Sequence, residues 1–563
     1  MHSDIAPFTP VEQMRCIRTR ASILAILFAG CALFASMLRG AEPKKPAEDR
    51  ADVVVYGATP SGIAAALAAK REGANVILIE ELHRVGGMYT VGGMGLTDSF
   101  FMDRRMLDGI YEEIHGRIDR HYRSFGVQYR PDNHRDAFPK DQGRWYHEPK
   151  VAEKIFEDML REAGIRVLLR SPLKSVRKDG ARIAAILLQD GRTVSARQFV
   201  DASYTGDLMA TTNVKYAVGR EGRNVFGESM AGKQTMFGQR KIWQVNPRDD
   251  AGKLLPYVNT DDPGPEEEGD HKIQNYNFRV NLTDDPANRV PFPKPANYDP
   301  SKFELFRRHF RVSPSASIKS PYPLPGRKFD LNDSQSQAFT IAIPGGSWEY
   351  PEGDHLVRKR IEQEHREFTL GYFHFVLTDP SVPAQVRQDF ARFGLPKDEH
   401  ADTGHFPPMI YIREARRMLG EYVLTQGDIQ DRPDKVDPIG VGLAPITIHN
   451  VQRVAVEGGY YHEGAAHTPY EPHGKPYQVP YRSLMPRRDQ CENLLVPVCL
   501  SASHVAFSSV RVEPTWIVLG QSAGVAAALA AKHGSAVHDV PYPDLRRRLL
   551  AQRQVLDLAP PRP

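Results

Sequence analysis

The hydrophobic positions near the start of the folded chain predict a strand, a tight turn, a helix and a second strand. Residues 52–56 are β-branched and apolar, which is typical of a buried parallel strand. Residues 63–70 are rich in alanine, the best helix former. Residues 76–79 form a second apolar run, which ends at Glu80. This order predicts a β–turn–α–β unit in an α/β protein.

Further short apolar runs predict a small antiparallel meander inserted after the first unit. They cover residues 167–169, 183–188 and 193–194, with turn residues between the last two. Residues 199–200 then return the chain to the parallel sheet. Asp201 ends that strand, where ligand-facing residues of open α/β sheets lie.

The middle of the chain has a different composition and predicts a second domain that holds the substrate. Residues 261–270 form an acidic loop broken by proline and glycine, which we expect at the solvated surface. Residues 286–325 are rich in proline, so we expect extended chain rather than helix. Residues 356–377 carry apolar side chains at helical spacing, which predicts a helix with one packing face.

The turn Gly57-Ala58-Thr59-Pro60-Ser61-Gly62 carries the first chemical signal. A helix N-terminus offers free N–H groups and a partial positive charge, and glycine lets the backbone approach a pyrophosphate. A carboxylate at the end of the second strand can accept hydrogen bonds from a ribose diol. We therefore predict a dinucleotide site. Its residues are Gly57, Thr59, Pro60, Ser61, Gly62 and Glu80.

Two features qualify this turn. Pro60 stands in the first helical turn, the one place where a helix accepts proline. Thr59 stands where the G-x-G-x-x-G pattern has its second glycine, so its side chain must lie near the phosphates or shift the turn. The alternative is an ordinary β–α turn that contains two glycines. A second cluster, at residues 85–95, has five glycines and includes Gly86, Gly87 and Met88, which indicates backbone lying flat against a ligand or a loop without function.

These motifs resemble the FAD-dependent oxidoreductase family of the glutathione-reductase-like flavoprotein class. The resemblance extends along nearly the whole chain after residue 50. Residues 199–210 look like the family's D-A-T/S-x-x-G-D-L segment. Further family stretches lie at residues 274–279, 411–418, 448–453, 480–484, 494–504, 511–514 and 519–528.

The resemblance implies a Rossmann-like domain that binds FAD and is built from discontinuous pieces. We expect a leader at residues 1–41, a linker at 42–50, the first part of the FAD-binding domain at 51–214, a mixed substrate or cap domain at 215–405, and the second part with a closing segment at 406–563. The resemblance adds Gly86, Gly87, Met88, Asp201, Gly206 and Asp207 to the expected FAD contacts.

The C-terminal family stretch predicts a further contact with the cofactor. Residues 516–519 are apolar, 520–524 are small and polar, and 525–532 form an alanine-rich helix. A helix N-terminus here would point its positive end at the flavin pyrimidine edge, where negative charge collects on reduction. The expected contacts are Gly520, Gln521, Ser522, Ala523 and Gly524. The alternative is a simple helix–strand contact that the glycines permit.

Several polar residues near these motifs could meet the substrate: Arg413, His449, Asn450, Arg482, His504, Arg511 and Glu513. A base for a substrate alcohol or amine would most naturally be histidine, whose pKa lies near neutrality. We take His504, Arg511 and His449 as the catalytic candidates, and prefer His504 because the flavin-facing segment follows it closely. Neither an acyl-transfer triad nor a metal-ligand spacing stands out.

Charge and cysteine content exclude several classes of protein. The net charge of +4 is too small to suggest a nucleic-acid binder. The chain has four cysteines, Cys16, Cys31, Cys491 and Cys499, too few for a disulfide scaffold or a Cys-ligated zinc site. The family also resembles the flavoprotein component of heterodisulfide reductase, which carries iron–sulfur clusters. After removal of the leader only Cys491 and Cys499 remain, whereas a Cys₄ cluster needs four thiolates. We expect buried Cys491 and Cys499 and direct hydride exchange rather than a dithiol relay.

The N-terminus predicts export. Arg15, Arg18 and Arg20 precede an apolar run at residues 21–38, which is typical of a secretory leader. We expect a periplasmic or secreted protein without a stable membrane span once the leader is cleaved. An uncleaved anchor is one alternative, because the run approaches the length that crosses a bilayer. A lipid on Cys31 is the other, because the residues before it resemble a lipobox.

Three functions therefore stand as hypotheses. The leading one is an exported flavoenzyme that transfers a hydride between FAD and a small polar substrate, carbohydrate-derived ones included, with an electron acceptor that the sequence does not identify. Family members are sometimes labelled xanthan lyase, so a polysaccharide lyase-like enzyme with a structural FAD is the second. The third is a flavin-binding protein without catalysis.

Overall fold

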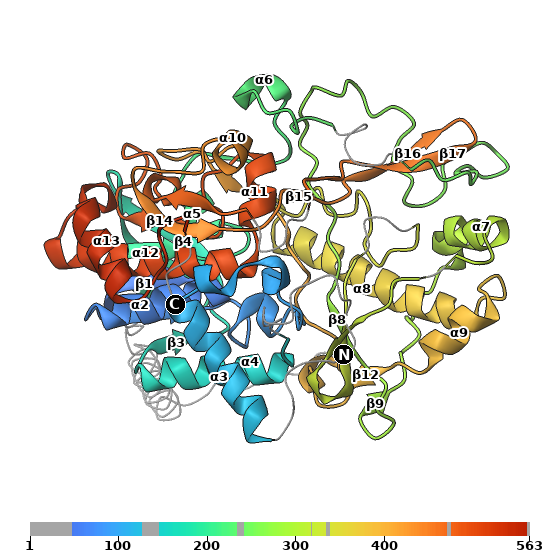
Figure 1. The fold of residues 1–563 in the computed structure, drawn as a ribbon, viewed down its shortest axis with the longest axis horizontal. Coiled ribbons are helices and arrows are strands. Elements are labelled where there is room, and N and C mark those ends of the chain that lie inside the picture. Colours follow the sequence, from blue (N-terminus) through green and yellow to red (C-terminus); the bar gives the residue numbers. More distant parts are fainter. Residues whose placement is uncertain are drawn as a thin grey trace, which may run out of the picture.

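The computed structural model describes residues 48–125, 146–233, 241–316, 318–333, 338–469 and 475–559. The predicted leader, Cys16 and Cys31 lie outside these residues. Figure 1 shows the nucleotide-binding elements on one side of the molecule and the cap elements α7, α8 and α9 on the other.

The predicted β–turn–α–β unit is confirmed. β1 (Glu48–Tyr56), α2 (Pro60–Arg71) and β2 (Val76–Ile79) follow one another, and helix α2 begins at Pro60. β1 pairs in parallel with β2 on one side and with β6 (Thr193–Asp201) on the other. The sheet has seven strands in the order β3-β2-β1-β6-β5-β4, and β20 (Leu494–Leu495) pairs in parallel with β6.

The antiparallel meander is present, but one of its predicted strands is wrong. β4 (Leu173–Asp179) pairs with β5 (Arg182–Leu188), and β5 pairs with the start of β6. β3 (Arg166–Leu168) instead pairs in parallel with β2 at the edge of the sheet. The length of an apolar run does not tell an edge strand of the meander from an edge strand of the parallel sheet. Either strand pairs with only one neighbour. β6 returns to the parallel sheet and ends at Asp201, as predicted.

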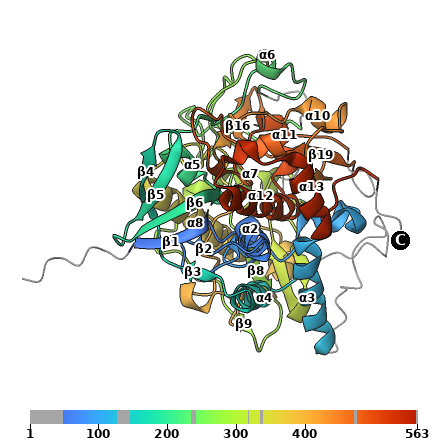
Figure 2. The ribbon, with the colours of Figure 1, turned by 90° about the vertical axis from the view of Figure 1, so that its left-hand side faces the viewer.

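The C-terminal helix corrects the expectation for residues 520–524. α12 (Glu513–His533) is one continuous helix, so these residues lie inside it rather than at its N-terminus. A Cβ on Gly520 would lie 2.1 Å from the Ser61 carbonyl oxygen, and one on Gly524 would lie 2.1 Å from that of Ala65. The two glycines therefore let α12 press against α2, as Figure 2 shows. This packing role is close to the alternative stated above, with a helix in place of a strand.

Within the described part of the chain, one helix is long and apolar enough to cross a membrane. It is α12, and it is entirely buried inside the protein. Three further helices cover this half of the molecule: α3 (Ile110–Ser124), α4 (Pro149–Glu162) and α13 (Tyr542–Ala551).

The cap contains the predicted long helix and a second helix. The second one lies in the proline-rich segment that we expected to be extended. α8 (His355–Thr378) confirms the helix expected at 356–377. The segment at 286–325 is not wholly extended, because it contains α7 (Glu304–Val312). Proline is absent from residues 303–312, and Phe306 and Phe310 bury one face of α7. Phe303 stacks on Phe368 of α8, which holds the two helices together.

A hairpin from the C-terminal part of the chain also belongs beside the cap. β16 (Gln452–Val456) and β17 (Gly459–Glu463) pair with each other. Bridges join Tyr460 to Trp243 and Val454 to Thr260. Figure 1 shows this hairpin on the cap side. The expected division at residue 405 does not include it in the cap.

The remaining elements are short. In the cap and its borders lie β7 (Tyr216–Ala217), α6 (Arg223–Phe226), β8 (Val280–Thr283), β9 (Arg289–Val290), β10 (Tyr322–Leu324), β11 (Lys328–Leu331), α9 (Ala384–Ala391) and β12 (Leu395–Pro396). The others are α5 (Asp207–Thr211), β13 (Arg417–Met418), α10 (Gln426–Gln430), β14 (Pro438–Gly442), β15 (Thr447–Ile448), β18 (Ala466–His467), β19 (Tyr477–Pro480) and α11 (His504–Val510).

Candidate active site

The turn at the N-terminus of α2 has the geometry that the glycines predict. Gly57 has a φ of +95°, and a Cβ there would lie 2.7 Å from the Ser203 nitrogen. A Cβ on Gly62 would lie 1.9 Å from the Gly57 carbonyl oxygen. Both positions therefore require glycine, one for its backbone conformation and one for the close approach of helix and turn.

Thr59 occupies the position of the second glycine of the pattern and has a structural role there. It is the N-cap of α2, and its Oγ1 accepts a hydrogen bond from the Gly62 nitrogen at 3.1 Å. The same Oγ1 donates to the Ala202 carbonyl oxygen at 2.8 Å. The hydroxyl is therefore used to fix the helix start to the loop after β6.

Glu80 lies at the end of β2, as predicted, and is buried. Its carboxylate accepts hydrogen bonds from the Ala58 nitrogen at 2.7 Å and the Leu82 nitrogen at 2.9 Å. Burial raises the pKa of this carboxyl group, and the two backbone donors oppose that rise. Glu80 thus touches the glycine turn directly, and its contact with a ribose remains a prediction.

The second glycine cluster lies against the first turn. Gly87 has a φ of +49°, and a Cβ there would lie 3.2 Å from the Thr59 Cα and 2.6 Å from the Tyr204 hydroxyl. The Met88 nitrogen donates to the Tyr204 hydroxyl at 3.0 Å. Tyr204 donates in turn to Glu513, the first residue of α12. Gly86 has a φ of +99°, and its surroundings leave no room for a Cβ either.

The acids of the D-A-S-Y-T-G-D segment make structural contacts. Asp201 accepts hydrogen bonds from the Ser203 and Met209 nitrogens, and burial raises its pKa to about 6. Asp207 forms ion pairs with Arg358 of α8 and with Arg416. Gly206, in the left-handed conformation at φ +66°, permits the turn between them. Asp207 therefore ties the sheet to the cap, and an FAD contact for Asp201, Gly206 or Asp207 remains a prediction.

Three buried arginines converge on Tyr411. The guanidinium carbon of Arg413 lies 4.7 Å from the Tyr411 ring centre, and that of Arg279 lies 5.9 Å from it. Arg511 Nη1 lies 3.4 Å from the Tyr411 hydroxyl. All three arginines are at most 4% exposed. We call Arg279, Tyr411, Arg413 and Arg511 the arginine cluster.

His449 and Asp333 form a pair beside the arginine cluster. The His449 Nδ1 lies 3.5 Å from an Asp333 carboxylate oxygen. Burial lowers the pKa of His449 well below its ordinary value, and Arg413 lowers it further. Burial would raise the pKa of Asp333, but the contact with His449 and the charge of Arg413 outweigh it and hold that pKa far below its usual range. The pair therefore combines a neutral imidazole with an ionised carboxylate at neutral pH.

The structure brings His449 and Arg511 together, and Gln274 connects His449 to Glu414, the partner of His504. Arg511 Nη2 donates to the carbonyl oxygen of Thr447, two residues before His449. His504 begins α11, whereas Arg511 follows its end. The His504 Nδ1 is 2.8 Å from Glu414, which also pairs with Arg417. The Nε2 of His504 is buried without a partner, so its catalytic role remains a prediction.

The other polar candidates have distinct positions. Arg482 is half-exposed and pairs with Asp437. Asn450 contacts His462 of the β16–β17 hairpin. Glu513 is buried at the start of α12. Sequence reasoning missed Asp333, Arg279 and Tyr411. Arg279 and Tyr411 stand in family stretches, but nothing in the sequence around Asp333 distinguishes it.

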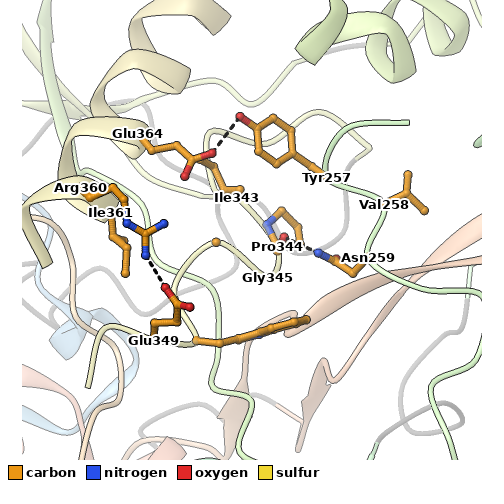
Figure 3. Close-up of a pocket in the computed structure, with 12 residues that line it drawn as sticks. Tyr257, Val258, Asn259, Ile343, Pro344, Gly345, Glu349, Arg360, Ile361 and Glu364 are labelled. Atoms are coloured by element: carbon orange, nitrogen blue, oxygen red, sulfur yellow. Dashed lines mark hydrogen bonds and ion pairs between the residues drawn. The ribbon is translucent and has the colours of Figure 1, made fainter. Parts of the chain in front are cut away.

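A separate pocket lies in the cap, with a volume of about 320 Å³. Figure 3 shows Tyr257 and Glu364 reaching toward each other across it, while Arg360 pairs with Glu349. Its charged groups thus have partners within the pocket. The arginine cluster, by contrast, contains buried donors without partners, at the Nε atoms of Arg413 and Arg511. We therefore take the arginine cluster with His449 and Asp333 as the candidate active site.

Comparison with known families identifies the class of protein. The sequence profile of the FAD dependent oxidoreductase family matches residues 52–549. The chain belongs to this family, which makes it an FAD-dependent oxidoreductase with a Rossmann-like fold. No curated protein matches the chain.

Several solved flavoprotein structures are similar to parts of the chain. OxyS anhydrotetracycline hydroxylase from Streptomyces rimosus is 14% identical, over 31% of this chain and 38% of that one, with a TM-score of 0.24. L-amino acid deaminase from Proteus vulgaris is 15% identical, over 32% and 54%, with a TM-score of 0.22. L-proline dehydrogenase from P. horikoshii is 14% identical, over 31% and 59%, with a TM-score of 0.24. The chain covers less than two thirds of each of these structures.

The residues at the first turn fit FAD. Gly57 and Gly62 leave no room for a Cβ, so the backbone stays bare at the start of α2. The Ser61 hydroxyl, in the first turn of that helix, is buried against Gly520 of α12. The bare backbone at the start of α2, with its free N–H groups, suits a phosphate group.

Proposed function

We propose that the protein oxidises a small polar substrate by hydride transfer to FAD, with His449 as the proton acceptor. One observation carries this proposal. Arg511 of the arginine cluster lies two residues before Glu513. Glu513 binds the Tyr204 hydroxyl, which also binds the Met88 nitrogen of the second glycine cluster. The candidate active site therefore adjoins the segments that fit the cofactor.

The residues that would hold FAD lie in the first turn, at the end of β2 and in the second glycine cluster. They are Gly57, Ser61, Gly62, Glu80, Gly86, Gly87 and Met88. FAD held there would supply the acceptor for a hydride from a carbon of the substrate. The chain itself must then remove the proton of the substrate's hydroxyl or amino group.

His449 has the surroundings that this step needs. Its Nδ1 faces the ionised Asp333, which fixes the ring and stabilises a proton that the ring takes up. Its low pKa keeps the imidazole neutral before the reaction, so it can act as a base. Its side chain is 12% exposed, whereas the Asp333 side chain is fully buried. The exposed part of the ring is the part that a substrate can reach.

Anaerobic mixing of the FAD-loaded enzyme with candidate polar substrates, sugars included, tests this proposal. Loss of the oxidised flavin absorbance is the expected result for at least one substrate. A polysaccharide lyase would instead give an unsaturated product with the flavin unchanged, and a protein that only binds flavin would give neither signal. Either of those outcomes would refute the proposal.

We propose further that the enzyme works outside the cytoplasm. The basic residues Arg15, Arg18 and Arg20 before the apolar run at 21–38 support this. Sequencing the N-terminus of the protein from its native cell tests it, with a start between about residues 35 and 42 expected for a cleaved leader. A start at a lipidated Cys31 or an intact Met1 in the membrane would replace the cleaved leader by an anchor.

A further inference from the structure

We propose that the substrate carries a carboxylate group and that Arg511 and Arg413 bind it. This inference rests on the proposed function and names the class of molecule that would be oxidised. It follows from the charges of the arginine cluster and from the hydrogen bonds that its members lack.

Arg279 is the member of the cluster whose charge is already neutralised. Its Nε donates to Asp330 at 2.9 Å, and its Nη2 forms an ion pair with the second oxygen of the same carboxylate. Both side chains are almost fully buried. This two-point contact is the strongest arrangement for an arginine and an acid, and it leaves Arg279 a structural role.

Arg511 has no such partner. It is 4% exposed, and its hydrogen bonds go only to neutral oxygens, those of Thr447 and Tyr411. Its Nε has no partner at all. Among the described residues, no carboxylate lies within 4.0 Å of its nitrogens. A buried charge without a counter-ion costs several kcal/mol, so this site is suited to a ligand that brings a negative charge.

Arg413 is in a similar position. It is fully buried and donates to the Asn275 carbonyl oxygen at 2.5 Å and to the Asn277 side chain. Its Nε also lacks a partner. The nearest carboxylate is Asp333, at 4.0 Å, and Asp333 faces His449 as well. Burial lowers the pKa of Arg413 to about 10, and the charge of Asp333 opposes that fall.

The remaining charged groups nearby do not cancel this excess. Asp98 interacts electrostatically with Arg279, Arg511 and Arg413, but within the described residues it forms no ion pair with them. Burial raises the pKa of Asp98. Lys319 adds another cation, since its Nζ donates to the Asp333 backbone oxygen. The cluster therefore favours a ligand with one negative charge.

A carboxylate is the anion that two arginines bind best at short range. The planar guanidinium matches the two oxygens of a carboxylate. Asp98, Thr447 and His449 beside the cluster are only partly buried, so the cluster lies close to the solvent. Both Arg413 and Arg511 act electrostatically on His449. The oxidised carbon would then lie close to the carboxylate, as in short hydroxy- or amino-carboxylates.

Binding to the FAD-loaded enzyme tests this inference with acetate, propionate and benzoate as probes. Acetamide, propionamide and benzamide are the matched neutral probes, and the flavin absorbance spectrum reports binding. We expect the carboxylates to give a saturable spectral change and the amides to give none. Carboxylates that bind no better than their amides would overturn the inference.

Variants locate the binding site. Arg511→Gln should weaken carboxylate binding at least tenfold, and Arg511→Lys should weaken it less, because it keeps the charge but loses the two-point geometry. Arg488→Gln, at a half-exposed arginine that pairs with Asp539, should bind as the unchanged enzyme does. Unchanged carboxylate binding in Arg511→Gln together with a shifted flavin midpoint potential would overturn the inference, because Arg511 would then serve the cofactor. If Arg511→Gln loses FAD, Arg413→Gln takes its place in the same comparison.

The outcomes separate this inference from the proposed function. Flavin reduction by neutral substrates alone would refute the carboxylate and leave hydride transfer in place. Carboxylate binding without flavin reduction by any hydroxy- or amino-carboxylate would support the binding site and count against the redox proposal.

Discussion

The Tyr204 hydroxyl donates a hydrogen bond to the Glu513 carboxylate at 2.5 Å, although 309 positions separate the two residues. The same hydroxyl accepts a hydrogen bond from the Met88 nitrogen. One phenol thus connects the second glycine loop, the loop after β6 and the start of α12. The C-terminal helix therefore contributes a contact that holds the second glycine cluster in place.

Glu513 should make stability depend on pH. Burial raises its pKa to about 8. An acid whose pKa is raised by folding stabilises the fold below about pH 4.5 and loses that contribution as the pH rises toward 8. Glu513→Gln keeps the size and can still bond Tyr204, but does not ionise. We expect it to be more stable than the unchanged protein at pH 8–9, by about 1–4 kcal/mol, as measured by chemical unfolding. A difference in the free energy of unfolding between the two proteins that stays constant from pH 5 to 9 would contradict this.

Asp207 and Arg358 should stabilise the junction between sheet and cap. Burial would raise the pKa of Asp207, but Arg358 outweighs it and holds that pKa far below its usual range. An acid with a lowered pKa stabilises the fold above about pH 4 and loses this contribution as the pH falls further. Arg358→Met leaves Asp207 with Arg416 as its remaining ion-pair partner, so we expect a cost of about 1–3 kcal/mol at pH 7.

The neighbouring Arg360 supplies the control for that change. It pairs with Glu349, and both side chains are exposed. Arg360→Met should therefore change the free energy of unfolding by less than about 1 kcal/mol. Equal losses in the two variants would show that the buried pair has no special weight.

His449 and His504 are both candidates for the residue that accepts the substrate's proton. Because His449 lies beside the arginine cluster and His504 is tied to Glu414, we expect His449→Ala to slow flavin reduction by about 10²-fold or more while FAD stays bound. His504→Ala should slow it less. Rapid-mixing kinetics of both variants decide between them, and a larger effect at His504 would restore the preference drawn from the sequence.

The cysteines should be dispensable for electron transfer. Cys491 and Cys499 are both buried and free, and burial raises the pKa of each thiol. A buried thiol with a raised pKa is a poor nucleophile. Replacing both by serine should leave flavin reduction by substrate within about tenfold, a change of up to ~1.4 kcal/mol in the barrier. Loss of turnover in this double variant would point to a thiol relay.

The nucleotide-binding half was largely predictable because its signals are local. The strand, the turn and α2 follow one another without interruption. Gly57 supplies the positive φ of the turn, and Gly62 lets the start of the helix approach Gly57. The start of α12 was not predictable in the same way. The small residues 520–524 look like a turn in the sequence, but they serve the contact with α2, which only the folded chain brings near.

The candidate active site was predictable only in part. Arg413, His449 and Arg511 stand in family stretches, so the residue types were found, but their partners were not. Asp333 lies 116 positions before His449, and no periodic pattern relates them. The preference for His504 relied on closeness in sequence, whereas α11 separates His504 from Arg511 in space.

The FAD content of Gly57→Val tests the central claim most directly. Gly57 has a φ of +95°, and a Cβ there would lie 2.7 Å from the Ser203 nitrogen, so valine must displace the turn that fits the cofactor. Gly116→Val is the matched control, because a Cβ at that helical position would meet only Arg120, at 3.6 Å. The account predicts a folded Gly57→Val protein that purifies without FAD, and a Gly116→Val protein with a full complement. Full FAD occupancy in Gly57→Val would contradict the assignment of the cofactor to this turn.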